Sequence, residues 1–121
     1  MMDRRNALIA LRDAVRDGTL PEPIFHGSHA VRGHWAYTTP LTSKQRNQVF
    51  LAYNGSLDAA MALHEALFPR WMWGRDTEGA IWVARDMYHV VHGPDFEANH
   101  ENTARAWLLA ILEALIAQEG E

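Results

Sequence analysis

The sequence contains no cysteine, and this absence excludes several classes of protein. Without thiols the chain can form no disulfide framework, thiolate zinc finger or iron–sulfur site, and it has no cysteine nucleophile. No apolar run is long enough for a signal peptide or a membrane span, since Arg12 and Asp13 interrupt the first apolar stretch. We therefore expect a soluble cytoplasmic protein with no membrane partner.

Positive charge is also scarce. Eleven basic residues stand against fifteen acidic ones, the formal net charge is −4, and no run of basic residues occurs. Binding to duplex nucleic acid depends on Lys and Arg side chains that neutralise phosphates, so we expect no duplex partner. The chain has no glycine-rich phosphate loop and no Gly-x-Ser-x-Gly turn. The sequence predicts no cofactor and no catalytic residue, and it favours a protein that is not an enzyme.

The length of 121 residues predicts a single domain, 1–121. A chain of this size buries about two-thirds of its unfolded surface, which is enough for a core without covalent cross-links. We find no linker, repeat or low-complexity tract. Within the domain, 1–48 is expected to supply an N-terminal helix and a first strand.

Three segments show the apolar period of about 3.6 residues that is typical of a helix, namely 3–17, 57–68 and 103–118. Asp3 can cap the start of the first helix, and Gly18 can close its end in a left-handed conformation. Ser56 can cap the second helix, which Pro69 ends. Thr103 is the expected cap of the third helix.

Strands are expected where β-prone apolar residues alternate or run together, namely at 34–38, 49–53, 71–73 and 80–84, with a further strand at 88–92. The clearest pair flanks the turn at 76–79, where Gly79 can adopt positive φ, and predicts a β-hairpin. We expect 42–48 to form a polar loop. The order α-β-β-α-β-β-α predicts an α+β fold, an antiparallel sheet with helices packed on its faces.

Four stretches carry a family resemblance: Tyr53-Asn54-Gly55-Ser56-Leu57-Asp58-Ala59-Ala60, Trp71-Met72-Trp73, 80–84 and Thr103-Ala104-Arg105-Ala106-Trp107-Leu108. They resemble the phage ABA sandwich domain family, whose members carry a Tyr-Thr-x-Ser-Leu-Asp-Ala-Ala helix start, a Gly-Trp-x-Trp strand and a final Thr-Pro-Ala-Leu-Ala-Leu helix. The resemblance covers 49–118, with Arg70 at the family's glycine and Ala104 at its proline. It implies a phage or prophage origin and a sheet with helices on both sides, and it implies no assigned activity.

The seven histidines raise an alternative chemistry. Imidazole binds zinc, nickel or copper, and His26, His29 and His34 can converge if their segment is a loop. His89 and His92 would face opposite sides of a regular strand, which makes them weaker candidates. His64 lies on the apolar stripe of its helix, and we expect a packed histidine with a hydrogen-bonded ring nitrogen.

Five tryptophans are the most unusual feature of the composition. Core packing accounts for at least half of them, but a domain of this size has a limited interior. Exposed Trp, Tyr and Arg side chains are enriched at protein–protein binding hot spots. The candidate partner-binding residues are Trp73, Arg75, Trp35, Tyr37 and Arg32.

These observations favour a non-catalytic phage or prophage accessory protein that binds a host or phage protein in the bacterial cytoplasm. A counter-defence inhibitor of a host nuclease or CRISPR complex would fit the acidic composition. The alternative is a small metal-binding protein or metal-dependent enzyme that uses His26, His29 and His34. The sequence leaves the number of subunits open.

Overall fold

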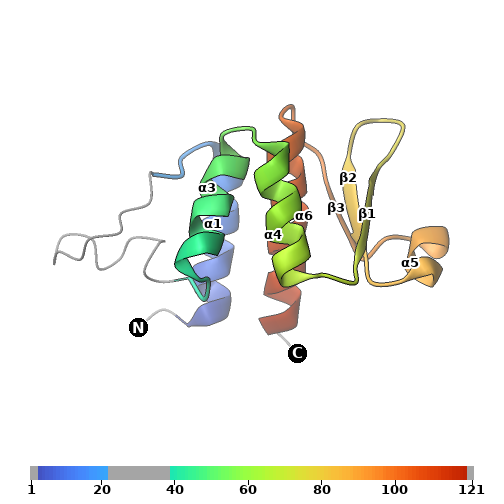
Figure 1. Cartoon of the computed structure of the whole chain (residues 1–121), viewed down its shortest axis with the longest axis horizontal. Coiled ribbons are helices and arrows are strands. Elements are labelled where there is room, and N and C mark those ends of the chain that lie inside the picture. The colour runs from blue at the N-terminus through green and yellow to red at the C-terminus, as the bar shows by residue number, and fades with distance from the viewer. Residues whose placement is uncertain (1–2, 22–38, 120–121) are drawn as a thin grey trace, which may run out of the picture.

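A computed structural model of the chain describes residues 3–21 and 39–119 (Figure 1). In this part of the chain, helices and a three-stranded antiparallel sheet form an α+β fold, as the sequence predicts. The elements are α1 (Arg4–Asp17), α3 (Ser43–Tyr53), α4 (Leu57–Leu67), β1 (Met72–Arg75), β2 (Ile81–Ala84), α5 (Met87–His92), β3 (Phe96–Ala98) and α6 (Thr103–Glu119). Among these helices, none combines the length and the apolar character that a membrane span requires.

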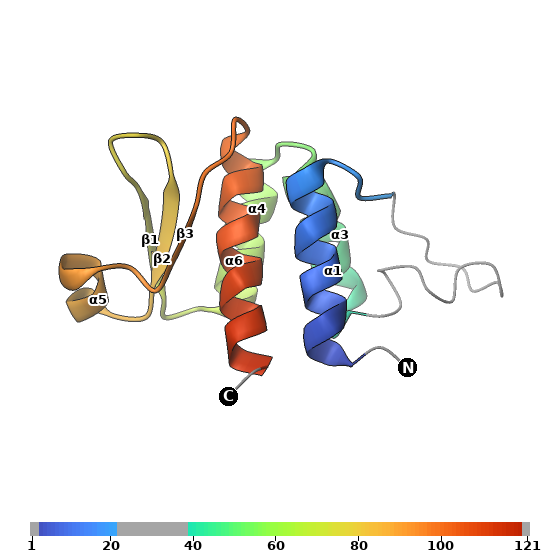
Figure 2. The same ribbon diagram turned by 180° about the vertical axis from the view of Figure 1, so that it is seen from behind.

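Four helices pack side by side, and the sheet stands beside two of them. Figure 1 shows α3 and α4 in front of α1 and α6, and Figure 2 shows the same helices from behind. The sheet lies next to α4 and α6, and in both views α5 lies beyond the sheet, on the side away from these helices. Helical residues therefore lie on both sides of the sheet.

The ends of α1 are those predicted from the sequence. The Asp3 carboxylate accepts the backbone N–H of Asn6 at 2.7 Å, which satisfies one of the free donors at the helix start. Gly18 has φ of 74° and closes the other end, because a left-handed residue lets the chain turn back toward the last carbonyls. One face of the helix is buried, namely Leu8, Leu11 and Val15.

The prediction of a strand at 49–53 is wrong, and so is the prediction of a polar loop at 42–48. Both segments belong to α3, which begins after a capping box. The Thr42 hydroxyl accepts the Gln45 N–H, while the Gln45 side chain accepts the Thr42 N–H. This reciprocal pair stabilises the first turn and thereby commits the apolar residues that follow to a helix.

Two further helix starts bear on the predictions. Ser56 caps α4 as expected, since its hydroxyl accepts the N–H of Ala59 at 3.1 Å. In α6 the cap is Asn102, one residue before the predicted Thr103, and its side-chain oxygen accepts the N–H of Arg105 at 3.1 Å. α6 packs against α1, α3, α4, β2 and β3, which makes it the centre of the core.

The β-hairpin is confirmed, with Trp73 opposite Val83, Gly74 opposite Trp82, and Gly79 at φ of 93° in the turn. The sheet order is β1-β2-β3. The prediction of a strand at 88–92 is wrong, because this segment lies in α5, and the third described strand is β3. Among the described residues the element order therefore differs from the predicted α-β-β-α-β-β-α, and the strand predicted at 34–38 lies outside them.

The two faces of the sheet carry different aromatic residues. On the face toward the helices, Trp73 packs on Trp107 of α6 with ring centroids 4.0 Å apart. On the opposite face, Trp82 lies across Gly74, where a Cβ would come within 2.3 Å of the Trp82 ring. Glycine at position 74 therefore permits a contact between the indole and the backbone that no other residue allows.

A buried histidine joins α4, α6 and the segment that leads into β1. Trp107 can only donate, so His64 Nδ1 accepts its indole N–H at 3.2 Å. His64 Nε2 then carries the proton and donates to the carbonyl oxygen of Trp71 at 3.0 Å. The predicted packed histidine is confirmed, with both ring nitrogens hydrogen-bonded.

We predict that His64→Leu lowers the free energy of unfolding by about 2–4 kcal/mol, because it leaves the Trp107 N–H and the Trp71 carbonyl without partners. Urea unfolding measures the change. Glu65→Gln, at the exposed neighbouring position, is the control and should change stability little. A His64→Leu variant as stable as the control would contradict this role.

Candidate functional site

The predicted site residues fall into two groups. Trp73 is 42% exposed and Arg75 is exposed, both on β1 at an edge of the sheet. The other predicted residues lie outside the described residues, namely His26, His29, Arg32, His34, Trp35 and Tyr37. In residues 3–21 and 39–119, no three His, Asp or Glu side chains gather closely enough to hold a metal ion. The metal-binding alternative therefore stays a prediction.

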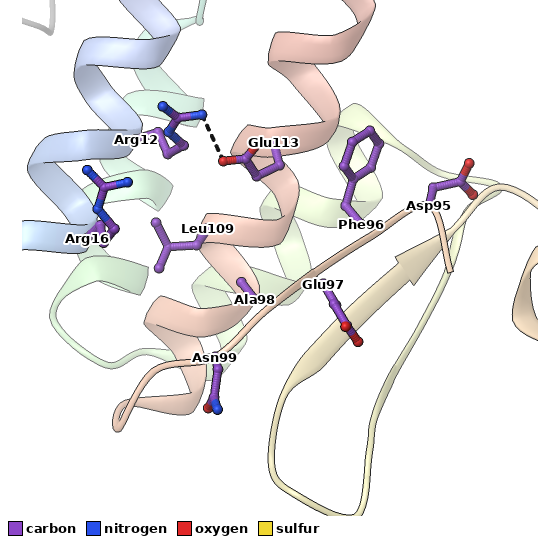
Figure 3. A pocket seen from close by; sticks show the side chains of 9 residues that line it. All are labelled: Arg12, Arg16, Asp95, Phe96, Glu97, Ala98, Asn99, Leu109 and Glu113. Carbon is purple, nitrogen blue, oxygen red and sulfur yellow. Dashed lines mark hydrogen bonds and ion pairs between the residues drawn. The ribbon is translucent and has the colours of Figure 1, made fainter. Parts of the chain in front are cut away.

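A groove of about 440 Å³ lies between α1, α6 and β3. Figure 3 shows Arg12 and Arg16 on the α1 side, Leu109 of α6 between the elements, and Asp95 and Glu97 directed away from the helices. The groove is thus bordered by an edge strand on one side and by two guanidinium groups on the other.

Both guanidinium groups of this groove already have carboxylate partners. Arg12 pairs with Asp13 at 3.1 Å and with Glu113 at 2.9 Å. Burial opposes the charge of Arg12, but these two carboxylates outweigh burial and raise the pKa of Arg12 above its usual value. Arg16 pairs with Asp13 and Asp17. An anionic ligand would therefore have to displace existing partners, which makes the groove a weak candidate.

The segment 85–95 forms a loop that carries the short helix α5 outside the sheet. Asp86 caps α5, since its carboxylate accepts the N–H of His89 at 3.0 Å. The same carboxylate lies 2.6 Å from His89 Nδ1, which must carry the proton because an ionised carboxylate only accepts. This hydrogen bond lowers the pKa of Asp86.

An ion pair closes the loop at its base. The Asp95 carboxylate accepts the backbone N–H of Arg85 at 2.8 Å and its side-chain Nε–H at 2.7 Å. The Asp95 side chain is only 3% exposed. Burial alone would raise the pKa of Asp95, but the hydrogen bonds and charge of Arg85, with the charge of His89, hold this pKa below its usual 3.8.

α5 turns three of its four apolar residues outward, and only Val90 is partly buried. Met87, Tyr88 and Val91 are 57%, 66% and 70% exposed, which makes them the three most exposed large hydrophobic side chains among the described residues. The ring of Tyr88 packs on that of His92 with centroids 4.4 Å apart. The partly buried side of α5 holds His89, whose Nε2 lies 4.0 Å from Asp95. A polar contact thus faces the protein and an apolar surface faces away from it.

The prediction of a strand at 88–92 concealed this surface, since Met87, Tyr88 and Val91 come together only in a helix. The signal that could have found it is the Asp86 cap, three residues before His89, followed by the stop at Gly93-Pro94. In a helix, Val91 lies three residues after Tyr88 and four after Met87, so it neighbours both on the helix surface.

Comparisons with protein families, with curated proteins and with solved structures found no match to this chain. The resemblance to the phage ABA sandwich domain family therefore stays a prediction.

We predict that Asp95→Asn lowers the free energy of unfolding by about 1–2 kcal/mol at neutral pH, because the charged hydrogen bonds to Arg85 are weakened. Urea unfolding measures the loss. Glu97→Gln removes an exposed carboxylate from the same part of the sheet and serves as the control, with a change close to zero. Equal losses in both variants would contradict a specific role for Asp95.

The difference in the free energy of unfolding between the native chain and Asp95→Asn should depend on pH. A carboxyl whose pKa is lower in the folded state than in the unfolded state stabilises the fold above the unfolded value and loses this effect as pH falls. The stability difference should therefore be constant at neutral pH and shrink once pH drops through 3.8 toward the lower folded pKa. Unfolding curves at a series of pH values test this, and a difference that grows with acidity would contradict it.

Proposed function

We propose that this chain is a non-catalytic accessory protein of phage or prophage origin that acts by binding another protein through the outward face of α5. The observation that carries the proposal is the exposure of Met87, Tyr88 and Val91 on one side of this helix. Apolar side chains clustered on a surface and rimmed by polar residues are typical of interaction sites.

The way α5 is held supports this role. The Asp86 and Asp95 contacts position the loop through polar groups, so the exposed Met87, Tyr88 and Val91 are not needed to attach α5 to the sheet. In a helix that is attached to its own protein by apolar packing, the apolar residues are buried and the polar residues are exposed. The hydrogen bonds of Asp86 and Asp95 hold α5 in place before a partner binds. A contact surface that is already formed loses less entropy on binding.

The resemblance to the phage ABA sandwich domain family supports the phage or prophage origin, and with it a host or phage protein as the partner. Fifteen acidic residues against eleven basic ones favour a partner that presents a basic surface. A host nuclease or CRISPR complex is the partner class that we propose, since such proteins carry basic surfaces for nucleic acid.

We predict that Val91→Asp weakens capture of the partner by at least about tenfold, because it places a charge at the centre of the apolar face. The full chain is immobilised, and proteins retained from a bacterial lysate are quantified. Ala10→Asp adds the same charge at an exposed position of α1, a helix that Figure 1 shows on the far side of the sheet from α5, and should leave capture unchanged.

Thermal melting of both variants shows whether they remain folded. The proposal is contradicted if no protein is retained above empty resin, or if the same protein is retained equally by the native chain and by Val91→Asp.

A further inference from the structure

Exposed apolar side chains also gather around β1 and α4. Leu57 and Met61 of α4, and Met72 and Trp73 of β1, are all exposed. β3 borders the groove beside α1, so β1, at the opposite edge of the sheet, lies on the side of α3 and α4. Since α4 packs against α3 and α6, its exposed residues face away from both of these helices. Met72 alternates with Trp73 and therefore points to the opposite face of the sheet. We call Leu57, Met61, Trp73 and the edge of β1, which pairs only with β2 among the described residues, the α4/β1 face.

The hydrogen-bond pattern of the hairpin shows which groups form this free edge. Asp76 N–H donates to the Ala80 carbonyl at 2.9 Å, so these two residues form a hydrogen-bonded pair. Bonded and non-bonded pairs alternate along an antiparallel ladder, so Gly74 bonds to β2. The N–H and C=O groups of Trp73 and Arg75 then point away from β2. β1 contains no proline or lysine, the residues that commonly protect such an edge.

We propose that this edge pairs antiparallel with β1 of a second copy of the chain about a two-fold axis. The two three-stranded sheets then form one continuous sheet. Because the sheets stay in line, the exposed sides of the two α4 helices are brought together across the axis, and Leu57 and Met61 become buried.

The charges on this face complement those of a copy related by a two-fold axis. In the described part of the chain, Arg70, Arg75 and Glu78 form no ion pair. With Gly74 at the axis, the turn that holds Arg70 before β1 comes to the same end of the interface as the turn that holds Glu78 in the second copy, and Arg75 lies opposite Trp73 of the second copy. The first arrangement brings opposite charges to one end, and the second places a guanidinium group beside an indole ring.

In an alternative register, Arg75 would lie opposite Arg75 of the second copy. This register is disfavoured because it places two positive charges side by side. Gly74 suits the axis because it has no side chain, and Trp82 lies over it on the outer face. The two Trp82 rings would meet there and cover the junction. In a two-fold interface the same patch of both copies has to complement itself. The α4/β1 face meets this requirement, because its backbone donors meet acceptors, its charges meet opposite charges and its apolar side chains meet each other.

Sedimentation equilibrium and light scattering of the full chain test the proposal. The expected result is a concentration-dependent mass that approaches twice 13.7 kDa. A mass of 13.7 kDa at every concentration overturns the proposal.

Two variants locate the interface. Arg75→Pro removes an N–H that points to the second copy and leaves the bonds of β1 to β2, since proline is tolerated on strand edges. Met61→Glu places a charge where the α4 helices meet. Each should raise the dissociation constant of the dimer by at least about tenfold. If circular dichroism shows that Arg75→Pro is unfolded, Met61→Glu decides alone.

Val91→Asp, on α5, is the matched control and should leave the dimer intact. A dimer that persists undiminished in folded Met61→Glu overturns the proposal, and so does a dimer lost in folded Val91→Asp. Because α5 takes no part in this interface, the dimer and the capture of a partner by α5 can be lost independently of each other. If the β1 edge instead binds an extended segment of another protein, this chain would be a monomer that binds a peptide. That result also overturns the proposal.

Discussion

The arrangement of the core depends on the hydrogen bonds of one buried histidine. His64 accepts the indole N–H of Trp107 and donates to the carbonyl oxygen of Trp71, so it joins α6, α4 and the start of the hairpin. The Trp107–His64 bond is buried and the bond to Trp71 is partly buried, so each of these polar groups would be costly to leave without a partner. The imidazole satisfies both with one side chain, and this fixes the distance between the sheet and the helices.

The position of β1 and of α5 follows from that constraint. Because the Trp71 carbonyl is held by α4, β1 begins at a defined place, and Trp73 packs on Trp107. β2 then pairs with β1, and the Arg85–Asp95 pair closes the loop beyond β2. Met87, Tyr88 and Val91 of α5 are left outside because the side-chain hydrogen bonds and ion pairs that hold this loop join other residues. The two proposed interaction surfaces thus both depend on where the hairpin is placed.

The elements that the sequence predicts correctly are those with strong local signals. Asp3 and Ser56 are caps, Gly18 and Pro69 are stops, and Gly79 marks the hairpin turn. The strand predicted at 49–53 failed because β-prone residues were weighed without the capping box that precedes them. Propensity is a weak predictor, and a cap that satisfies backbone donors outweighs it.

The rest of the candidate site has little local signal. β3 contains three residues, too few for a periodic pattern, and it is a strand because β2 offers it hydrogen-bonding partners. The Arg85–Asp95 pair spans ten residues, and no local rule links them. Trp73 and Arg75 were predicted to bind a partner from residue type alone, while the more exposed α5 residues were missed with their helix. Composition can therefore point to an exposed surface, but only the fold shows which residues form it.

The place of α6 in the chain has a consequence for biosynthesis. This helix is the hub against which α1, α3, α4 and two strands pack, yet it follows all of them in sequence. A ribosome must therefore translate residue 119 before the hydrophobic interior can close, and α1 waits for a partner about a hundred residues downstream. Until then the nascent helices expose their apolar sides, so cells that make this protein have to shield them from aggregation during translation.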